Sequence, residues 1–358
     1  VTFGVGDPNE ACLPGDETSQ EGFAALYDST GALVWVRGLA GDARIAVGDA
    51  AVDPADGAVY VSGLLAGELS VAEGEPAELA FPAPEATAGF VVKLDADGDP
   101  LWGRVTGGAG RALVRDVAVD ADGGLIAVGR FYGPVTFNAG EPDEASADAE
   151  DQVHLFVLRL AADGGLELLC ILESTALWNT FTNEVDVAVA PGGFYVSGRF
   201  SDSLVLAPGE DEETTLVQTG SSVHGDVFLA RYDDGGELEW ARSFGGELDT
   251  TCQDLAALPD GSAVLAGSFQ GWTPLGEGAD EVVLYTDGNA DDRDIFVARY
   301  GAGGELEWAV SAGGYAAGDR GMGAAATPAG GLVVAGWFQY PAIFGKGDEN
   351  QALVIDED

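Results

Sequence analysis

Four aspartates recur at one position of a repeated segment, and their carboxylates are the groups best suited to hold a metal ion. They are Asp49, Asp116, Asp186 and Asp254, separated by 67, 70 and 68 residues. Carboxylates brought together repel one another unless a cation or hydrogen bonds intervene. Ca²⁺ takes about six to eight oxygen ligands, so the pattern indicates a candidate calcium site. Two alternatives stay open: each aspartate accepts backbone N–H bonds from its own loop, or it pairs with an arginine such as Arg130 or Arg199.

Five aromatic residues in or beside the long connections could bind a ligand. They are Tyr132, Trp178, Trp272, Tyr315 and Tyr340. Exposed rings can stack on sugars or anchor a protein partner. The alternative for each ring is partial burial against the edge of a sheet. This set predicts a binding surface for a glycan or a surface protein.

Catalytic motifs are missing from the sequence, so we expect a protein that is not an enzyme. The chain has two histidines, His154 and His224, and carries no HExxH, GxSxG or GxxxxGK[ST] segment. A pair of carboxylates for glycoside hydrolysis does not stand out, because acidic residues are spread along the whole chain. No catalytic residue is assigned, and no cofactor other than calcium is indicated.

The charge and the cysteines limit the partners and the setting. Sixty-one acidic residues against 15 basic ones give a net charge of −46, which disfavours nucleic acid as a partner. No apolar run of about 18 residues predicts insertion into a membrane. The three cysteines, Cys12, Cys170 and Cys252, allow at most one internal disulfide. The chain starts with Val and shows no signal peptide, which predicts a processed or trimmed product.

The elements that position these residues are repeated five times, with three anchors that return every 66–72 residues. The first anchor is an apolar ring: Phe23, Phe90, Phe156, Phe228 and Phe296. The second follows twelve or thirteen residues later: Trp35, Trp102, Leu169, Trp240 and Trp308. The third is a glycine: Gly63, Gly129, Gly198, Gly267 and Gly336. Five copies of three anchors make the repeat a strong signal.

Each repeat reads as two β-hairpins, and therefore as four antiparallel strands. Residues 228–233 alternate between two faces, the period-two pattern of a strand. A single four-stranded sheet cannot cover both of its faces, but sheets stacked around an axis can, which predicts one β-propeller domain over residues 1–358. In order from the axis we name the strands a, b, c and d.

The chain begins with a c–d pair at 22–37 and ends with an a–b pair at 321–338. We therefore expect five four-stranded blades, closed by pairing the N-terminal c–d half with the C-terminal a–b half. One hairpin-like element occurs six times, at both ends of the chain among other places, which leaves open a longer natural chain with more blades.

The sequence resembles the secreted bacterial beta-propeller repeat (SBBP) family, and the resemblance covers nearly the whole chain. The residues that carry it are DVFLARYDDGGELEWARSFGG at 226–246 and the following LAALPDGSAVLAGSFQG. The resemblance implies a propeller in a bacterial extracellular or cell-surface setting, and it supplies no catalytic residues. Leu169 departs from the pattern, since the other repeats have Trp there.

Long connections between strands b and c fall on one face of the predicted propeller, and long loops on a rigid scaffold commonly carry binding. We therefore expect a secreted or surface-displayed binding or adhesion propeller that recognises carbohydrate through this face. The alternative is a self-assembling structural subunit of an extracellular layer or filament, and a glycoside hydrolase is less favoured. Asp95, Asp97 and Asp99 faintly resemble a calcium loop but favour a tight turn. A row of basic residues on strand c is expected to pair with Glu167, Glu239 and Glu307.

Overall fold

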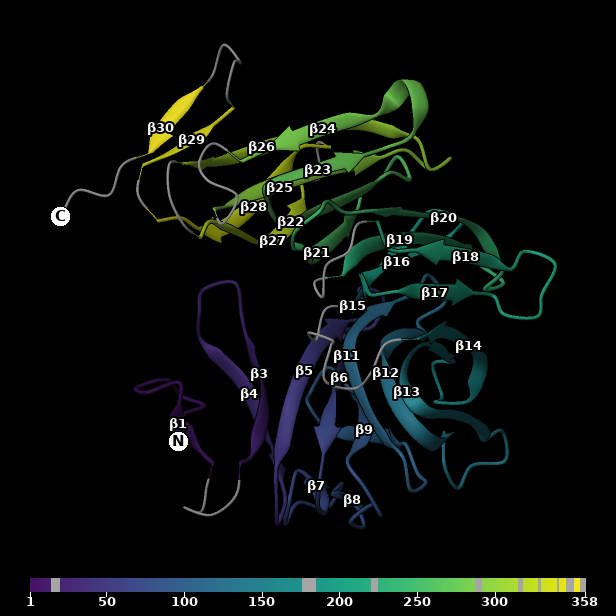
Figure 1. The fold of residues 1–358 in the computed structure, drawn as a ribbon. Coiled ribbons are helices and arrows are strands. Elements are labelled where there is room, and N and C mark those ends of the chain that lie inside the picture. The colour runs from purple at the N-terminus through teal and green to yellow at the C-terminus, as the bar shows by residue number, and fades with distance from the viewer. Residues whose placement is uncertain are drawn as a thin grey trace. The chain divides into compact units, whose positions relative to one another are not determined.

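The computed structural model describes a chain built almost wholly of β-strands (Figure 1). It describes residues 1–13, 20–175, 185–219, 225–286, 292–314, 318–327, 330–339, 341–345 and 351–354. Within these residues the one helical element is a three-residue 3₁₀ turn, η1 (Gly278–Asp280). The internal contacts divide the chain into two compact units, Val1–Cys170 and Ile171–Asp358. The two units are described separately below.

Four complete antiparallel sheets follow one another along the chain, each with its strands in the order a, b, c, d. The first unit holds β5 (Ile45–Val52), β6 (Val59–Leu65), β9 (Ala88–Leu94) and β10 (Pro100–Val105), followed by β11 (Arg111–Val119), β12 (Leu125–Phe137), β13 (Ala145–Leu160) and the first part of β14 (Leu166–Ser174), whose residues from Ile171 on belong to the second unit. The second holds β15 (Val185–Ala190), β16 (Gly193–Phe200), β19 (Asp226–Asp233) and β20 (Leu238–Phe244), followed by β21 (Thr250–Ala257), β22 (Ala263–Gln270), β25 (Arg293–Tyr300) and β26 (Leu306–Gly314). The predicted all-β class and the two hairpins of each repeat are confirmed.

Two half-sheets flank the four complete sheets, as the sequence predicted. The first is the c–d pair β3 (Gly22–Tyr27) and β4 (Leu33–Ala40). The last is the a–b pair β27 (Arg320–Ala326) and β28 (Leu332–Trp337), which forms a two-stranded sheet. Strand a of one repeat contacts strand a of the next within each unit, as β5 does with β11 and β21 with β27. This arrangement of sheets resembles that of a β-propeller.

The long b–c connections fold into hairpins, and several of these extend the outer strand d of the preceding repeat. The hairpins are β7 (Leu69–Val71) with β8 (Leu79–Phe81), β17 (Ser203–Leu206) with β18 (Thr214–Val217), β23 (Trp272–Leu275) with β24 (Val282–Tyr285), and β29 (Ala342–Phe344) with β30 (Ala352–Val354). β7 pairs with β4, β17 with β14, and β29 with β26. β1 (Thr2–Phe3) and β2 (Ala11–Cys12) form a further hairpin, and the ends of β12 and β13 form another. The predicted loop face is therefore built largely of paired strands.

The glycine and phenylalanine anchors recur together because they lie opposite each other on strands b and c. Gly267 is paired with Phe296, whose ring is fully buried. A Cβ at Gly267 would overlap the carbonyl oxygen of Thr251 and come within 2.7 Å of the Phe296 ring. Only glycine leaves room for that ring. The same pairing recurs in the other complete sheets: Gly63 with Phe90, Gly129 with Phe156, and Gly198 with Phe228.

Apolar side chains fill the space between successive sheets within each unit. In the first unit the cluster joins Leu39 and Trp35 of the half-sheet to Val61 and Phe90 of the sheet that follows. In the second it joins Leu229 and Phe244 to Leu265, Phe296 and Tyr300. Burial of this kind is the main stabilising contribution, because it removes apolar surface from water between the sheets of each unit.

Candidate binding face

Two exposed aromatic rings lie opposite each other on the hairpin β23–β24. Trp272 is paired with Tyr285, and the two residues are 42% and 65% exposed. Trp272 was predicted from the sequence, and Tyr285 was not. Counting outward from the turn of this hairpin, through Leu275 opposite Val282, would have identified Tyr285.

The other predicted aromatic residues have different positions. Tyr132 lies inside β12, where its backbone pairs with Arg111 and Val153 and its side chain is half-buried. Its burial agrees with the alternative we stated, packing against the sheet. Trp178, Tyr315 and Tyr340 lie outside the described residues.

The acidic turns of the hairpins are held by one repeated hydrogen bond. A glycine N–H donates to the carboxylate of the glutamate four residues later, at 2.7–2.9 Å, in Gly6–Glu10, Gly74–Glu78, Gly140–Glu144 and Gly209–Glu213. These glycines have φ between +78° and +88°, a region that L side chains rarely adopt. The N–H of Gly74 and the hydroxyl of Ser70 hold the pKa of Glu78 below its usual value. These glutamates therefore shape the turns.

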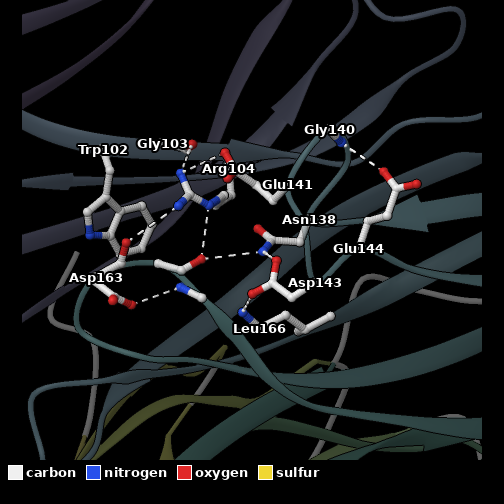
Figure 2. A network of polar contacts seen from close by, with 12 residues as sticks. Trp102, Gly103, Arg104, Asn138, Gly140, Glu141, Asp143, Glu144, Asp163 and Leu166 are labelled. Atoms are coloured by element: carbon white, nitrogen blue, oxygen red, sulfur yellow. Dashed lines mark hydrogen bonds and ion pairs between the residues drawn. The ribbon is translucent and has the colours of Figure 1, made fainter.

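Arg104 joins three segments of the first unit (Figure 2). Its Nε donates to the Gly164 carbonyl and its Nη1 to the Gly103 carbonyl, each at 2.9 Å. Nη1 also lies 3.5 Å from the Glu141 carboxylate, and the guanidinium lies over the Trp102 ring. The guanidinium thus connects β10 to the hairpin turn and to the c–d turn of the next repeat.

Asp143 completes the connection shown in Figure 2 by accepting hydrogen bonds from Leu166 N and Asn138 Nδ2, both at 2.6 Å. Burial acts to raise the pKa of Asp143, but these hydrogen bonds outweigh it and the net pKa is lowered. The carboxylate therefore stays charged and tied to its own repeat.

The tryptophan anchor makes a matching contact between successive repeats. The indole Nε1 donates to a carbonyl in the c–d turn of the next repeat: Trp35 to Ala96, Trp102 to Ala162, and Trp240 to Ala302, at 2.8–3.0 Å. Each ring lies against a glycine of that turn, as Trp240 does against Gly304. In all three repeats an arginine follows two residues later. The sequence reading missed this Trp-x-Arg pattern, although it was visible there.

The four aspartates of the candidate calcium site are on strand a, and all but Asp186 lie beside irregularities in its pairing. The register shifts just before Asp116 and just before Asp254, and Asp49 lies within a similar shift of β5. Asp254 accepts the N–H of Ala324 at 2.6 Å, from strand a of the next repeat, and that of Leu255 at 2.9 Å. This carboxylate acts as a backbone acceptor, which agrees with the first of the two alternatives to a metal, except that one donor belongs to the next repeat. Within the described residues no three His, Cys, Asp or Glu side chains gather closely enough to hold a metal ion.

Arg199, which we named as a possible partner of these aspartates, pairs with an aspartate outside the predicted set. The buried Asp249 accepts from Arg199 Nη2 and from Arg293 Nη2, both at 2.5 Å. Burial raises the pKa of the nearby Asp226, although Thr219 donates two hydrogen bonds to it. Asp226, Arg199, Asp249 and Arg293 therefore form a largely buried polar cluster at the start of strand c.

Two smaller predictions from the sequence are confirmed. In the Asp95 turn, Asp95 Oδ1 accepts the N–H groups of Asp97 and Asp99, which is a tight turn. The strand-c arginines pair with the expected glutamates: Arg159 with Glu167, Arg231 with Glu239, and Arg299 with Glu307. Among the described residues no helix is long and apolar enough to cross a membrane.

No protein-family model matches the chain. The chain is similar to the regulatory protein FlaEY of Caulobacter vibrioides, with 28% identity over 239 residues, which cover 63% of this chain and 23% of that protein. It is also similar to the uncharacterized WD repeat-containing protein L264 of Acanthamoeba polyphaga mimivirus. That identity is 21% over 388 aligned residues, covering 94% of this chain and 28% of that protein. The chain thus spans about a quarter of the length of these two curated relatives.

Among solved structures, the chain is similar to a protein of unknown function from Bacteroides caccae. The identity is 11% and the TM-score 0.33, with 82% of this chain and 94% of that one covered. The repeated four-stranded sheets agree with the WD repeat in the name of the mimivirus relative, because WD repeats form propeller blades.

Proposed function

We propose that this chain is a secreted or surface-displayed binding propeller that recognises carbohydrate through the hairpins between strands b and c. The observation that carries the proposal is the pair Trp272 and Tyr285, two largely exposed rings directly opposite each other on one hairpin. Exposed aromatic rings offer an apolar surface with a polar edge, which suits the C–H face and the hydroxyl groups of a sugar. Both rings stand on one two-stranded sheet, whose pairing sets their spacing before binding and so reduces the ordering entropy lost on association.

A screen of immobilised glycans tests this proposal. We expect selective binding by the unmodified chain and a loss of about tenfold or more in the variant Trp272→Ala/Tyr285→Ala. Val217→Ala is the matched control, because Val217 is the outer residue of the equivalent pair on β17–β18 and is 67% exposed. Repeating the screen with calcium and with EDTA tests the calcium hypothesis. Release of reducing ends during the screen would favour a glycoside hydrolase, and no binding to any glycan would overturn the proposal.

For the architecture we propose five blades in one ring, in which β3–β4 completes the sheet begun by β27–β28. The glycine–phenylalanine pairing supports this, because Gly336 of β28 and Phe23 of β3 are the two anchors outside a complete sheet. Phe23 is 52% exposed, whereas Phe90, Phe156, Phe228 and Phe296 are at most 1% exposed. The second unit also has a groove of about 570 Å³ beside β28, lined by apolar residues that include Ile295, Val297 and Val334. A phenylalanine ring resting on Gly336 would fill such a groove.

A structural role in an extracellular assembly is the second candidate. It is favoured by the apolar residues on the two half-sheets, such as Tyr27, Val333 and Trp337, which are 42–57% exposed. Surfaces of this kind commonly mark protein contacts. Sedimentation velocity at micromolar concentration distinguishes the two candidates, because ordered oligomers would favour assembly and a monomer would favour the binding propeller.

A further inference from the structure

Two grooves of the first unit occur at equivalent places in successive repeats. We define the first groove by Leu13, Glu21, the β4 residues Val36 and Gly38–Ala40, and the turn residues Ala72, Glu73 and Glu75. The second groove is defined by 81–85, 103–108 and 139–141. Their volumes are about 330 and 510 Å³, within the range of about 300–1,000 Å³ common for small-molecule sites.

The equivalence of the two grooves follows from the repeat. Leu13 corresponds to Phe81, Val36 to Gly103 and Glu75 to Glu141, each pair 66–68 residues apart. In both grooves one side is the residue that leaves a hairpin, the floor is strand d, and the other side is the turn of the next hairpin. The architecture of the repeat therefore builds this groove more than once.

Glycines keep the second groove open. Gly103, Gly107 and Gly108 contribute no side chains to its floor. A Cβ at Gly103 would overlap the ring of Phe81, so that half-buried ring lies directly on the backbone of β10. Pro82 and Pro84 extend the apolar side. The result is a rigid wall that offers ring and aliphatic C–H surface to a ligand.

Two carboxylates line this groove together with the apolar wall, and they determine which ligands suit it. The exposed Glu85 ends the segment that forms the wall, and Glu141 lies in the hairpin turn. Arg104 also lines the groove, but its guanidinium is already bound to two backbone carbonyls and to Glu141. Ionised carboxylates only accept hydrogen bonds, so the free capacity suits a ligand rich in hydroxyl donors. An anionic ligand is disfavoured, because the chain carries a net charge of −46.

We propose that these two grooves are tandem subsites for a neutral polysaccharide, whose hydroxyl groups donate to Glu85 and Glu73 while its C–H faces lie on the apolar wall. This inference rests on the proposed carbohydrate-binding function. It adds a site in the first unit, made of other residues than the Trp272–Tyr285 pair of the second unit, and it names the ligand class. Repetition of the groove points to a polymer, because two linked sites gain affinity only from a ligand that reaches both. The equivalent Glu75 and Glu141 are held by Arg37 and Arg104, and therefore position the turns.

Titration calorimetry with dextran, mannan and xylan tests the proposal, with polygalacturonate as the polyanion and chitosan as the polycation. We expect one neutral polymer to bind, and Glu85→Gln to weaken it about tenfold, because hydrogen bonds to a charged acceptor are the stronger ones. Glu73→Gln should act similarly, and the double variant should bind the polymer no better than a trisaccharide. The matched control Glu247→Gln removes an exposed carboxylate of the second unit and should leave binding unchanged.

A second variant does not depend on the carboxylates. Ala83 is exposed in the wall of the second groove, so Ala83→Trp should fill the groove without disturbing the core and abolish binding there. Ala55→Trp places the same side chain on an exposed a–b turn and should bind normally. Polymer affinity that neither Glu85→Gln nor Ala83→Trp lowers would overturn the groove assignment and leave the carbohydrate proposal standing. Preference for polygalacturonate or chitosan would overturn the ligand class, and no binding to any polymer would overturn both proposals.

Discussion

Single residues in this chain are constrained mostly by the backbone groups of neighbouring strands. Gly267 is required because a carbonyl oxygen and a buried ring occupy the space that any side chain would need. Asp254, which suggested calcium in the sequence, accepts two backbone N–H groups instead. The sequence showed that both positions recur, but it could not show what surrounds them, because a carboxylate suits either an amide or a cation.

At Gly267, alanine should destabilise the fold. The added methyl would overlap the Thr251 oxygen and press on the Phe296 ring, and overpacking of a core typically costs about 1–3 kcal/mol. Gly323→Ala is the matched control on another strand, since its Cβ would lie 3.7 Å from the nearest atom, and its effect should stay within about 0.5 kcal/mol. Equal free energies of unfolding for the two variants in urea would show that sterics do not explain the anchor.

At the scale of elements, the strands could be predicted from the sequence, but which strands pair with one another was predicted less well. Period-two alternation at 228–233 located β19 within its observed bounds, Asp226–Asp233. The hairpins between strands b and c were also predicted, yet their pairing with strand d of the preceding repeat was not. That pairing joins residues about 30 positions apart, such as Leu39 and Val71, and local patterns carry no information about it. The Trp-x-Arg pattern was visible in the sequence, but its contact with the c–d turn of the next repeat was not, because Trp240 and Ala302 are 62 residues apart.

The tryptophan contact between repeats gives a prediction at this scale. Trp240→Phe removes the hydrogen bond to the Ala302 carbonyl, 2.8 Å long, while keeping most of the ring. We expect a loss of about 1 kcal/mol in the free energy of unfolding and faster amide exchange in the 301–305 turn. Trp272→Phe is the control, because that ring is on the exposed hairpin and should leave stability unchanged. Unaltered exchange in the turn would mean that the indole N–H does not hold it.

At the scale of the whole molecule, the charge predicts how stability depends on salt. A net charge of −46 makes the folded chain repel itself. Raising NaCl from 0.01 M to 0.15 M shortens the Debye length from about 30 Å to about 8 Å, so the melting temperature should rise over that range. A melting temperature that does not change with NaCl would show that repulsion among the acidic residues does not limit the stability of the fold.

Closure of the proposed ring has a specific register that a disulfide can test. In the complete sheets the residue before the glycine anchor faces the residue after the phenylalanine, as Ala266 faces Val297 and Ser62 faces Val91. The same register in the fifth blade would bring Ala335 opposite Ala24. Opposite residues have Cα atoms about 4.5–5.5 Å apart, a separation that a disulfide spans.

With the exposed Cys12 changed to Ser, the variant Ala24→Cys/Ala335→Cys should form an internal disulfide under mild oxidation and remain monomeric. Ala24→Cys/Val334→Cys is the matched control, because a shift of one residue turns the thiol to the other face of the strand. Disulfide-linked dimers would show that the same two half-sheets join different copies of the chain, which would favour assembly over the ring. Equal oxidation of both variants, or of neither, would contradict this register and with it the five-bladed closure.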